Sequence, residues 1–225
     1  MSTAPAQRKE SGGLTSGQAG RFYDRFGRAQ DLQAFYEDRA TGDLLAHGRF
    51  DDARAVLEAG CGTGRLAARL LDGTLPAGAR YLGADISGTM TALAKARLRP
   101  FGGRARVIRA DATRPLPAAD GTFDRFVAVY LLDLLTPDHA AVMLAEARRV
   151  LAHGGLLCTA SLTPGVTPAT RLVSAAWAAA WSRAPWLTGG CRPVTVAPLL
   201  DGWHIEHRAQ VSAWGLTSEV IIASK

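Results

Sequence analysis

A glycine-rich segment followed at intervals by single acidic residues is the part of the sequence best suited to chemistry. Residues 58–64 read Glu-Ala-Gly-Cys-Gly-Thr-Gly. Glycines let the backbone turn tightly and let a ligand approach closer than any Cβ would permit. The spacing is neither that of a dinucleotide-binding fingerprint, since residue 65 is Arg, nor that of a P-loop, since no Gly-Lys-Ser/Thr follows. Glu58 would repel a pyrophosphate and attract a ligand that carries an ammonium or sulfonium group.

Two later acidic residues stand where predicted strands end. Asp85 follows Gly64 by 21 residues (85 − 64 = 21), the distance at which a carboxylate in such folds accepts hydrogen bonds from ribose hydroxyls. Ile86, next to it, would offer an apolar face to a base. Asp111 follows another predicted strand and could accept a hydrogen bond from the exocyclic amine of adenine. These residues together predict a site for a cationic nucleoside.

The elements that must position these residues alternate along the chain. We expect strands at 53–58, 81–85, 106–110, 123–130 and 156–161, helices at 65–72, 88–99, 136–151 and 169–182, and two further β-like runs at 204–210 and 218–223. This alternation predicts parallel βαβ units and an α/β, doubly wound sheet. Because such sheets bind ligands beyond the carboxyl ends of their strands, the residues after each strand should assemble into one site.

Composition excludes several classes of protein. A hydrophobic content of 48% with 20% charged residues is typical of a globular protein. Three cysteines without a C-x-x-C pair argue against a disulfide framework or a zinc ribbon and favour the cytoplasm. Residues 1–16 have no apolar core and are expected to form a disordered tail. The longest apolar run, residues 172–181, is too short for stable membrane insertion, which takes roughly 20 residues.

The basic residues are concentrated in one stretch. The chain has 26 Lys and Arg against 20 Asp and Glu, a net charge of +6, and six of the basic residues fall between Lys95 and Arg109 with no acid among them. In a doubly wound sheet most of this stretch lies on an outer edge and at strand entrances. We therefore expect it to be remote from the ligand, so the charge does not predict a nucleic-acid substrate.

Five segments in order resemble the motifs of class I S-adenosylmethionine-dependent methyltransferases. They are residues 58–64, 85–87, 110–112, 120–124 and 146–155, within a match that runs from about residue 54 to 162. The segments are similar to those of the branch that contains ubiquinone/menaquinone-biosynthesis and phospholipid N-methyltransferases. The resemblance implies a Rossmann-like, mostly parallel seven-stranded sheet with an antiparallel last strand. It also implies an N-terminal helical lid at 17–50, a methyltransferase domain at 51–225 and a lid insertion at about 164–200.

The resemblance further implies S-adenosyl-L-methionine as the cofactor. In this family the glycine loop lines the methionine moiety, the acid after the second strand holds the ribose, the acid after the third reads the adenine, and the end of the fourth strand passes close to the sulfonium. The residues that we expect to bind the cofactor are Glu58, Gly60, Cys61, Gly62, Gly64, Asp85, Ile86, Met90, Asp111, Ala112, Tyr130 and Leu131.

Asp133 is the first candidate for a catalytic role, because it stands just past the fourth predicted strand among leucines. A carboxylate there could take a proton or steady a cationic amine; the alternative is a turn cap that faces water. His139, in the first turn of the next helix, is a second candidate, with a solvent-facing histidine as the alternative. Tyr23, in the N-terminal segment, is a third, and a packing role weighs equally.

Four residues are expected to bind the substrate. Gln33 and Tyr36 belong to the N-terminal helical segment. Trp177 shares a helix face with Trp181 and could line an apolar or aromatic pocket or a dimer face. Arg192 lies in a loop rich in Gly and Pro, where it could bind a carboxylate or phosphate or form part of a plain turn.

We therefore expect a cytoplasmic enzyme that methylates a nitrogen or oxygen of an apolar or aromatic small molecule. The alternatives are a lipid or quinone methyltransferase at a membrane surface and a non-catalytic S-adenosylmethionine-binding protein, and a homodimer is open. No nucleic-acid partner is expected, because residues 129–132 read Val-Tyr-Leu-Leu where base-amino methylation uses an Asn-Pro-Pro-aromatic turn. No metal is expected, because no histidine stands at metal-ligand spacing with Asp, Glu or Cys.

Overall fold

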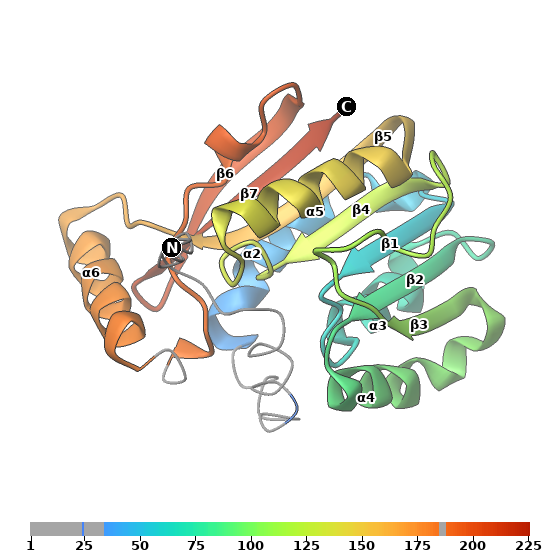
Figure 1. Ribbon diagram of the computed structural model, residues 1–225, viewed down its shortest axis with the longest axis horizontal. Helices are drawn as coiled ribbons and strands as arrows, with labels where there is room; N and C mark the ends of the chain where they lie inside the picture. Colours follow the sequence, from blue (N-terminus) through green and yellow to red (C-terminus); the bar gives the residue numbers. More distant parts are fainter. Residues whose placement is uncertain (1–23, 25–33, 185–187) are drawn as a thin grey trace, which may run out of the picture.

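The structure is a computed structural model that describes Asp24, residues 34–184 and residues 188–225 (Figure 1). The predicted tail at 1–16 and the candidates Tyr23 and Gln33 lie outside these residues. The helices are α2 (Ala34–His47), α3 (Arg65–Arg69), α4 (Gly88–Leu98), α5 (Pro137–Val150) and α6 (Pro168–Arg183). The strands are β1 (Ala55–Ala59), β2 (Arg80–Asp85), β3 (Ala105–Arg109), β4 (Phe123–Val129), β5 (Leu151–Thr163), β6 (His204–Ala213) and β7 (Leu216–Ser224).

All these strands belong to one seven-stranded sheet of order β3-β2-β1-β4-β5-β7-β6. The first five in sequence pair in parallel, whereas β7 lies between β5 and β6 and runs antiparallel to both. The expected α/β, doubly wound sheet with an antiparallel last strand is confirmed. The strand order reverses between β1 and β4, which is the point where such sheets open a crevice for ligands.

Helices cover both faces of the sheet. On one face, Leu44 of α2, Leu66 of α3 and Ala94 of α4 pack in one apolar cluster with buried strand residues. On the other, α5 contributes Met143 and its neighbours to a second cluster, and Figure 1 shows α5 crossing the front of the sheet. Helix α6 lies beyond one end of the strands (Figure 1). The central strands β1 and β4 are buried on both faces, as parallel strands require, whereas the edge strand β6 is largely exposed.

Local sequence signals start the helices α4, α5 and α6. Ser87 caps α4 by accepting a hydrogen bond from the Met90 amide at 3.1 Å. Thr136 caps α5, and Thr167 forms a capping box at the start of α6; a proline follows each threonine at the first helical position. These side chains satisfy amides that have no partner within the helix, so the starts were predictable.

The start of β5 differs from the expectation of a strand at 156–161. The helix ends at Val150, and β5 begins at once at Leu151, which pairs with Phe123. The pairing then jumps to Arg125 and Leu156, so the intervening residues of β5 bulge out of register, with Gly154 at φ +73°. A bulge takes up extra residues in this way without ending the strand.

Candidate active site

The glycine loop leaves β1 in a left-handed conformation. Gly60, Gly62 and Gly64 have φ angles of 70°, 51° and 75°, which residues with a side chain rarely adopt. A Cβ on Gly60 would lie 3.1 Å from the Leu131 side chain. The loop opens into a pocket that is also lined by Glu58, Cys61, Thr63 and Tyr130. Residues from the ends of the adjacent strands β1 and β4 therefore meet at the switch point of the sheet.

The carboxylate of Asp85 ties this loop to the next helix. Its Oδ2 accepts a hydrogen bond from the Gly62 amide at 2.9 Å, and its Oδ1 accepts one from the Ser87 amide at 2.9 Å. Asp85 is only 9% exposed, and burial raises its pKa against these two hydrogen bonds. Asp85 thus shapes the loop, and its contact with a ribose stays a prediction. Ile86 is half-buried beside it.

Glu58 is buried behind the loop and is paired with a tyrosine. The hydroxyl of Tyr81 in β2 donates a hydrogen bond of 2.5 Å to Glu58 Oε2. Burial raises the pKa of Glu58 to about 8 although the Tyr81 hydrogen bond opposes the shift. Burial also raises the pKa of the nearby Cys61 thiol, which keeps it protonated and unreactive. The sequence analysis assumed that Glu58 is ionised. With this pKa the carboxyl group is mostly protonated at pH 7, and a bound cation would favour its ionised form.

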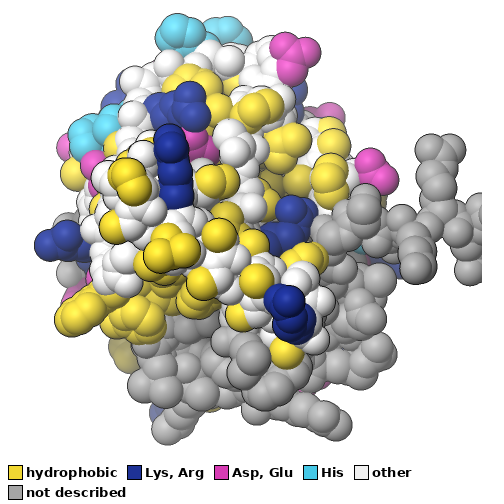
Figure 2. Space-filling view, turned by 90° about the vertical axis from the view of Figure 1, so that its left-hand side faces the viewer, with side chains coloured by type: hydrophobic (Ala, Val, Ile, Leu, Met, Phe, Trp, Pro, Cys, Tyr) yellow, Lys and Arg dark blue, Asp and Glu magenta, His cyan; other side chains and the backbone are white. Residues whose placement is uncertain are grey.

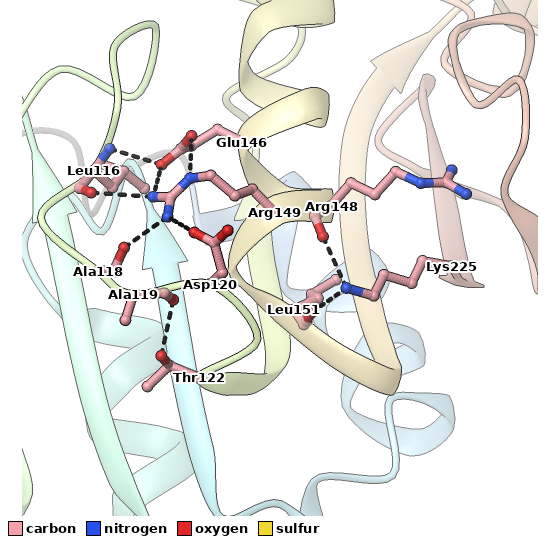
Figure 3. A network of polar contacts seen from close by, with 10 residues as sticks. All are labelled: Leu116, Ala118, Ala119, Asp120, Thr122, Glu146, Arg148, Arg149, Leu151 and Lys225. Carbon is pink, nitrogen blue, oxygen red and sulfur yellow. Dashed lines mark hydrogen bonds and ion pairs between the residues drawn. The ribbon is translucent and has the colours of Figure 1, made fainter.

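Asp111 and Ala112 lie where a loop leaves β3, and the loop behind them is anchored to α5. Asp111 Oδ1 accepts hydrogen bonds from the Thr113 amide at 2.9 Å and the Thr113 hydroxyl at 2.7 Å. Further along, Arg149 of α5 donates to the carbonyls of Leu116 and Ala118 and pairs with Asp120 and Glu146 (Figure 3). This network fixes the loop that closes the predicted adenine side.

Two tyrosines meet at the end of β4. Tyr130 has a φ of 51°, and its hydroxyl shares a hydrogen bond of 2.8 Å with the Ser218 hydroxyl. Tyr36 of α2 packs against it and is 2% exposed. Within the described residues the Tyr36 hydroxyl has no hydrogen-bond partner. Met90, which the sequence placed at the cofactor, is fully buried in the same apolar cluster as these two rings.

Asp133 is completely buried, so the alternative of a turn cap facing water is wrong. Its Oδ2 accepts a hydrogen bond from the Leu162 amide at 3.1 Å, whereas its Oδ1 accepts none from the described part of the chain. Burial raises the pKa of Asp133 to about 7, with the Leu162 amide and the Arg192 guanidinium opposing the shift. A carboxyl group with this pKa can hold or release a proton near neutral pH.

The loop before β6 closes over Asp133. The Arg192 amide donates to the Asp133 carbonyl at 3.2 Å, and the Arg192 guanidinium donates to the Leu135 carbonyl at 2.8 Å. The indoles of Trp177 and Trp181 hold the same loop by donating to the carbonyls of Cys191 and Gly190, each at 2.9 Å. These contacts agree with the plain-turn alternative for Arg192, and a role for its side chain in substrate binding stays a prediction.

Helix α6 presents different residues to the loop and to solvent. Trp177 also meets the Tyr36 ring, with centroids 6.3 Å apart, so its indole faces inward. Leu172 is 74% exposed on the outer side. Figure 2 looks onto the end of the molecule that carries α6 and shows hydrophobic side chains interspersed with separate basic ones. A dimer through α6 would use that outer side rather than the tryptophan indoles.

His139 and the basic stretch lie differently from the expectations. His139 is half-buried in the first turn of α5, and its Nδ1 has no partner among the described residues. No hydrogen bond or ion pair joins it to Asp133 among the described residues. Two of the basic residues are not remote: Arg97 donates to the Thr63 hydroxyl at 2.6 Å, and Arg109 donates to the Ile86 carbonyl at 2.9 Å. Their long side chains reach back to the loops beyond the strand exits.

Comparison with known proteins identifies the family. A model of a methyltransferase domain matches residues 56–155. A trans-aconitate 2-methyltransferase of Azoarcus sp. (strain BH72) is 30% identical over 191 residues, which cover 82% of this chain and 68% of that protein. The chain belongs to the class I S-adenosylmethionine-dependent methyltransferases. It is an enzyme of this family, and S-adenosylmethionine is its cofactor.

Solved structures share the fold of this methyltransferase. An S-adenosylmethionine-dependent methyltransferase from Methanosarcina mazei has a TM-score of 0.63 at 20% identity, over 80% of this chain and 96% of that one. The [4+2]-cyclase SpnF has a TM-score of 0.71 at 19% identity, over 95% of this chain and 98% of that one. At such identities the likeness concerns the fold alone. The branch of ubiquinone/menaquinone and phospholipid methyltransferases stays a prediction.

The pocket at the glycine loop fits the cofactor of the family. The loop has no room for a side chain at two of its glycines. A Cβ on Gly60 would lie 3.1 Å from Leu131, and one on Gly64 would lie 3.1 Å from Ala94. At these two positions glycine is therefore needed for the loop to pack against Leu131 and α4. Two buried acids with raised pKa, Glu58 and Asp85, stand beside it. A cationic ligand would stabilise their ionised forms.

Several pocket residues were not predicted from the sequence. Glu37 and Thr41 reach the pocket from α2, and Arg65 reaches it from α3. Asp24, described although its neighbours are not, accepts hydrogen bonds from the Ser87 hydroxyl at 2.6 Å and the Thr89 amide at 3.1 Å. Nothing in their local sequence marks these residues, except that the i, i+4 spacing of Glu37 and Thr41 puts them on one helix face.

Proposed function

We propose that this methyltransferase transfers the methyl group to a nitrogen or oxygen of an apolar or aromatic small molecule held beside Tyr36, Tyr130 and Trp177. The burial of Asp133, with one oxygen free of hydrogen bonds from the described residues and a pKa of about 7, carries the proposal. The Tyr36 ring contacts both of the other rings, and together they supply the apolar wall. The Asp133 carboxyl group supplies the polar contact that orients an amine or a hydroxyl.

The residues at the glycine loop would hold the cofactor. Glu58 and the loop amides would contact the amino-acid end, Asp85 the ribose diol, and Asp111 with Ala112 the adenine. Replacing Asp85 with Ala should weaken binding of the cofactor or its homocysteine product by about 10–100-fold, because a hydrogen bond to a charged group is worth about 1.5–3 kcal/mol. Isothermal titration calorimetry measures this change, with the exposed Asp201→Ala as the control. Unchanged affinity in Asp85→Ala would contradict the assignment.

The chain's own residues would do two things during transfer. The cofactor supplies an electrophilic methyl group on a sulfur that leaves without needing a proton. The aromatic wall would orient the acceptor, and orientation alone can lower a barrier by about 7–11 kcal/mol. Asp133 Oδ1 would accept the proton that the acceptor's O–H or N–H group loses as the new bond to carbon forms. Since the loop at 189–193 covers Asp133, it would have to move for the acceptor to enter.

A panel of acceptors tests this proposal. Labelled methyl transfer should be detected with aromatic amines or phenols, and Asp133→Asn should lower the rate by about 100-fold or more, the usual range for loss of a general base. Asp138→Asn is a matched control, because Asp138 is exposed in the first turn of α5. Activity that is equal in wild type and Asp133→Asn would exclude Asp133 as the base.

A carboxylate acceptor is the second candidate, favoured by the name of the relative, a trans-aconitate 2-methyltransferase. A carboxylate is already ionised and needs no base, and Arg192, which contacts Asp133, could bind it. The two candidates predict opposite effects of Asp133→Asn on turnover. Removing the Asp133 charge should raise the turnover of a polycarboxylate and lower that of a phenol. Including trans-aconitate in the panel therefore separates them.

The location and the membrane alternative also stay proposals. The three cysteines are buried and none forms a disulfide with another, which agrees with the proposed cytoplasmic location. Among the described residues, none of the helices has the length and apolar character needed to cross a bilayer. Adding lipid vesicles with a quinone to the acceptor panel tests the alternative of a lipid or quinone methyltransferase at a membrane surface.

A further inference from the structure

Two histidines and an aspartate come together on the outside of the molecule, away from the glycine loop. Asp43 and His47 are one turn apart on α2 and share a face, and His207 approaches them from β6. His207 Nε2 lies 2.8 Å from Asp43 Oδ2. His47 Nδ1 lies 3.5 Å from Asp43 Oδ1 and donates a hydrogen bond of 2.9 Å to the Asp43 carbonyl, which an ion bound at Nδ1 would break. One ligand atom of each residue lies within 4.8 Å of the others.

We propose that Asp43, His47 and His207 bind a divalent transition-metal ion of the zinc class. Neutral imidazole nitrogens and a carboxylate oxygen are ligands of Zn²⁺, and three protein ligands with a water at the fourth position complete a tetrahedral site. Mg²⁺ and Ca²⁺ prefer sites made of oxygen ligands, so two imidazoles select against them. The expectation of no metal overlooked the i, i+4 pair on α2 because its third ligand is 160 residues further on (207 − 47 = 160).

Binding requires a small rearrangement of the rings. The imidazoles of His47 and His207 are stacked, with centroids 3.7 Å apart and planes 8° apart. Each nitrogen lone pair lies in the plane of its ring, so parallel rings cannot both point at one ion. The side chain of His47 is 45% exposed, so its ring can rotate about χ2, which has a broad energy minimum. The side chain of His207 is 24% exposed and is more closely packed. The ion would also replace the proton shared by Asp43 and His207.

The site is separate from the proposed methyl transfer. His207 pairs with Ile222 of β7, whereas the Tyr130 hydroxyl meets Ser218, four residues earlier on that strand. Four residues of strand span roughly 13 Å. The ion would instead join the C-terminal end of α2 to β6. Since α2 carries Tyr36 near its other end, the ion would stabilise the position of the helix that packs against Tyr130.

Calorimetry with the metal alone tests the proposal. Chelator-treated full-length protein should bind about one Zn²⁺ per chain, and Mg²⁺ should give no heat at the same concentration. His207→Ala and His47→Ala should each weaken binding by about 100-fold or more, since even groups that only orient a ligand are worth about 10–100-fold. His204→Ala is the matched control, because His204 is exposed on β6 and outside the group. Circular dichroism would verify that each variant is folded.

Two further measurements distinguish this site from adventitious Zn²⁺ binding elsewhere on the surface. Zn²⁺ should raise the melting temperature of wild type and His204→Ala and leave that of the His47→Ala, His207→Ala double variant unchanged, because only a folded-state ligand stabilises. It should also shift the imidazole NMR signals of His47 and His207 as the stacking is lost. Absence of Zn²⁺ binding in wild type, or binding that persists in the double variant, would overturn the proposal.

Discussion

The ring of Tyr36 meets the ring of Tyr130 edge to face, with centroids 5.5 Å apart and planes 88° apart. This contact joins α2 to the end of β4, beside the pocket of the glycine loop. The two hydroxyls differ: Tyr130 shares a hydrogen bond with Ser218, and Tyr36 has no partner among the described residues. A buried hydroxyl without a partner is unfavourable for folding, so we expect the substrate to supply a polar partner.

Replacing Tyr36 with Phe should separate stability from activity. Removal of the buried hydroxyl should leave the free energy of unfolding unchanged or raise it by about 1 kcal/mol, because no hydrogen bond with the described residues is lost. Methyl transfer should nevertheless slow. Tyr130→Phe is the comparison, since it breaks the bond to Ser218 and should lower stability by about 1 kcal/mol. Urea unfolding measures both; a clear loss of stability in Tyr36→Phe would show that its hydroxyl is already satisfied.

Cofactor binding near neutral pH should release protons. Burial raises the pKa of Glu58 to about 8, so this group carries a proton at pH 7 in the free protein. A cation beside it favours the ionised form and lowers the pKa, which expels the proton. Calorimetry of S-adenosylmethionine binding in two buffers of different ionisation enthalpy should therefore give different apparent enthalpies. The difference should shrink in Glu58→Gln; equal enthalpies for wild type in both buffers would contradict a proton on Glu58.

Asp133 should make the protein less stable as the pH rises toward neutral. Its pKa is raised from 3.8 to about 7 in the folded state, so the folded protein binds more protons than the unfolded chain between these values. The stabilising contribution is complete below the unfolded pKa and is lost as the pH rises through about 7, at up to about 1.4 kcal/mol per pH unit.

Asp133→Asn removes the contribution of Asp133 to the pH dependence of stability. The contribution of Glu58 remains, and it also lowers stability as the pH rises, because its pKa is raised too. The stability of the variant relative to wild type should therefore increase between about pH 4 and about pH 7 and level off above that, as measured by urea unfolding at each pH. Asp138→Asn should show a constant difference from wild type. A constant difference for Asp133→Asn as well would mean that its carboxyl is ionised throughout.

Gly64→Ala should destabilise the protein, whereas Gly78→Ala should not. Gly64 has a φ of 75°, and an added methyl group would meet the backbone and side chain of Ala94 at 3.1 Å. The left-handed conformation alone costs about 1–2 kcal/mol for alanine. Gly78 has open space around it and should change stability by less than about 0.5 kcal/mol. Similar unfolding midpoints for the two variants would show that the loop relaxes freely.

The sequence alone determined the elements and the positions of the loops that follow them. Signals for these are local: glycines after β1, the caps Ser87 and Thr136, and apolar runs whose length suits buried strands. Since the carboxyl ends of parallel strands share one edge, such signals also predicted that Asp85 and Tyr130 would lie near the glycine loop. They could not predict where β5 begins, because its first pair with Phe123 depends on a neighbouring strand.

Only the tertiary structure decided the state of the side chains. The pairing of Glu58 with Tyr81, the complete burial of Asp133 and the reach of Arg97 to Thr63 each join residues more than twenty positions apart. The meeting of α2 with β6 at His47 and His207 spans most of the chain. The pKa of a carboxyl group and the partners of an imidazole depend on what surrounds them in space, and that environment is created only when distant elements pack together.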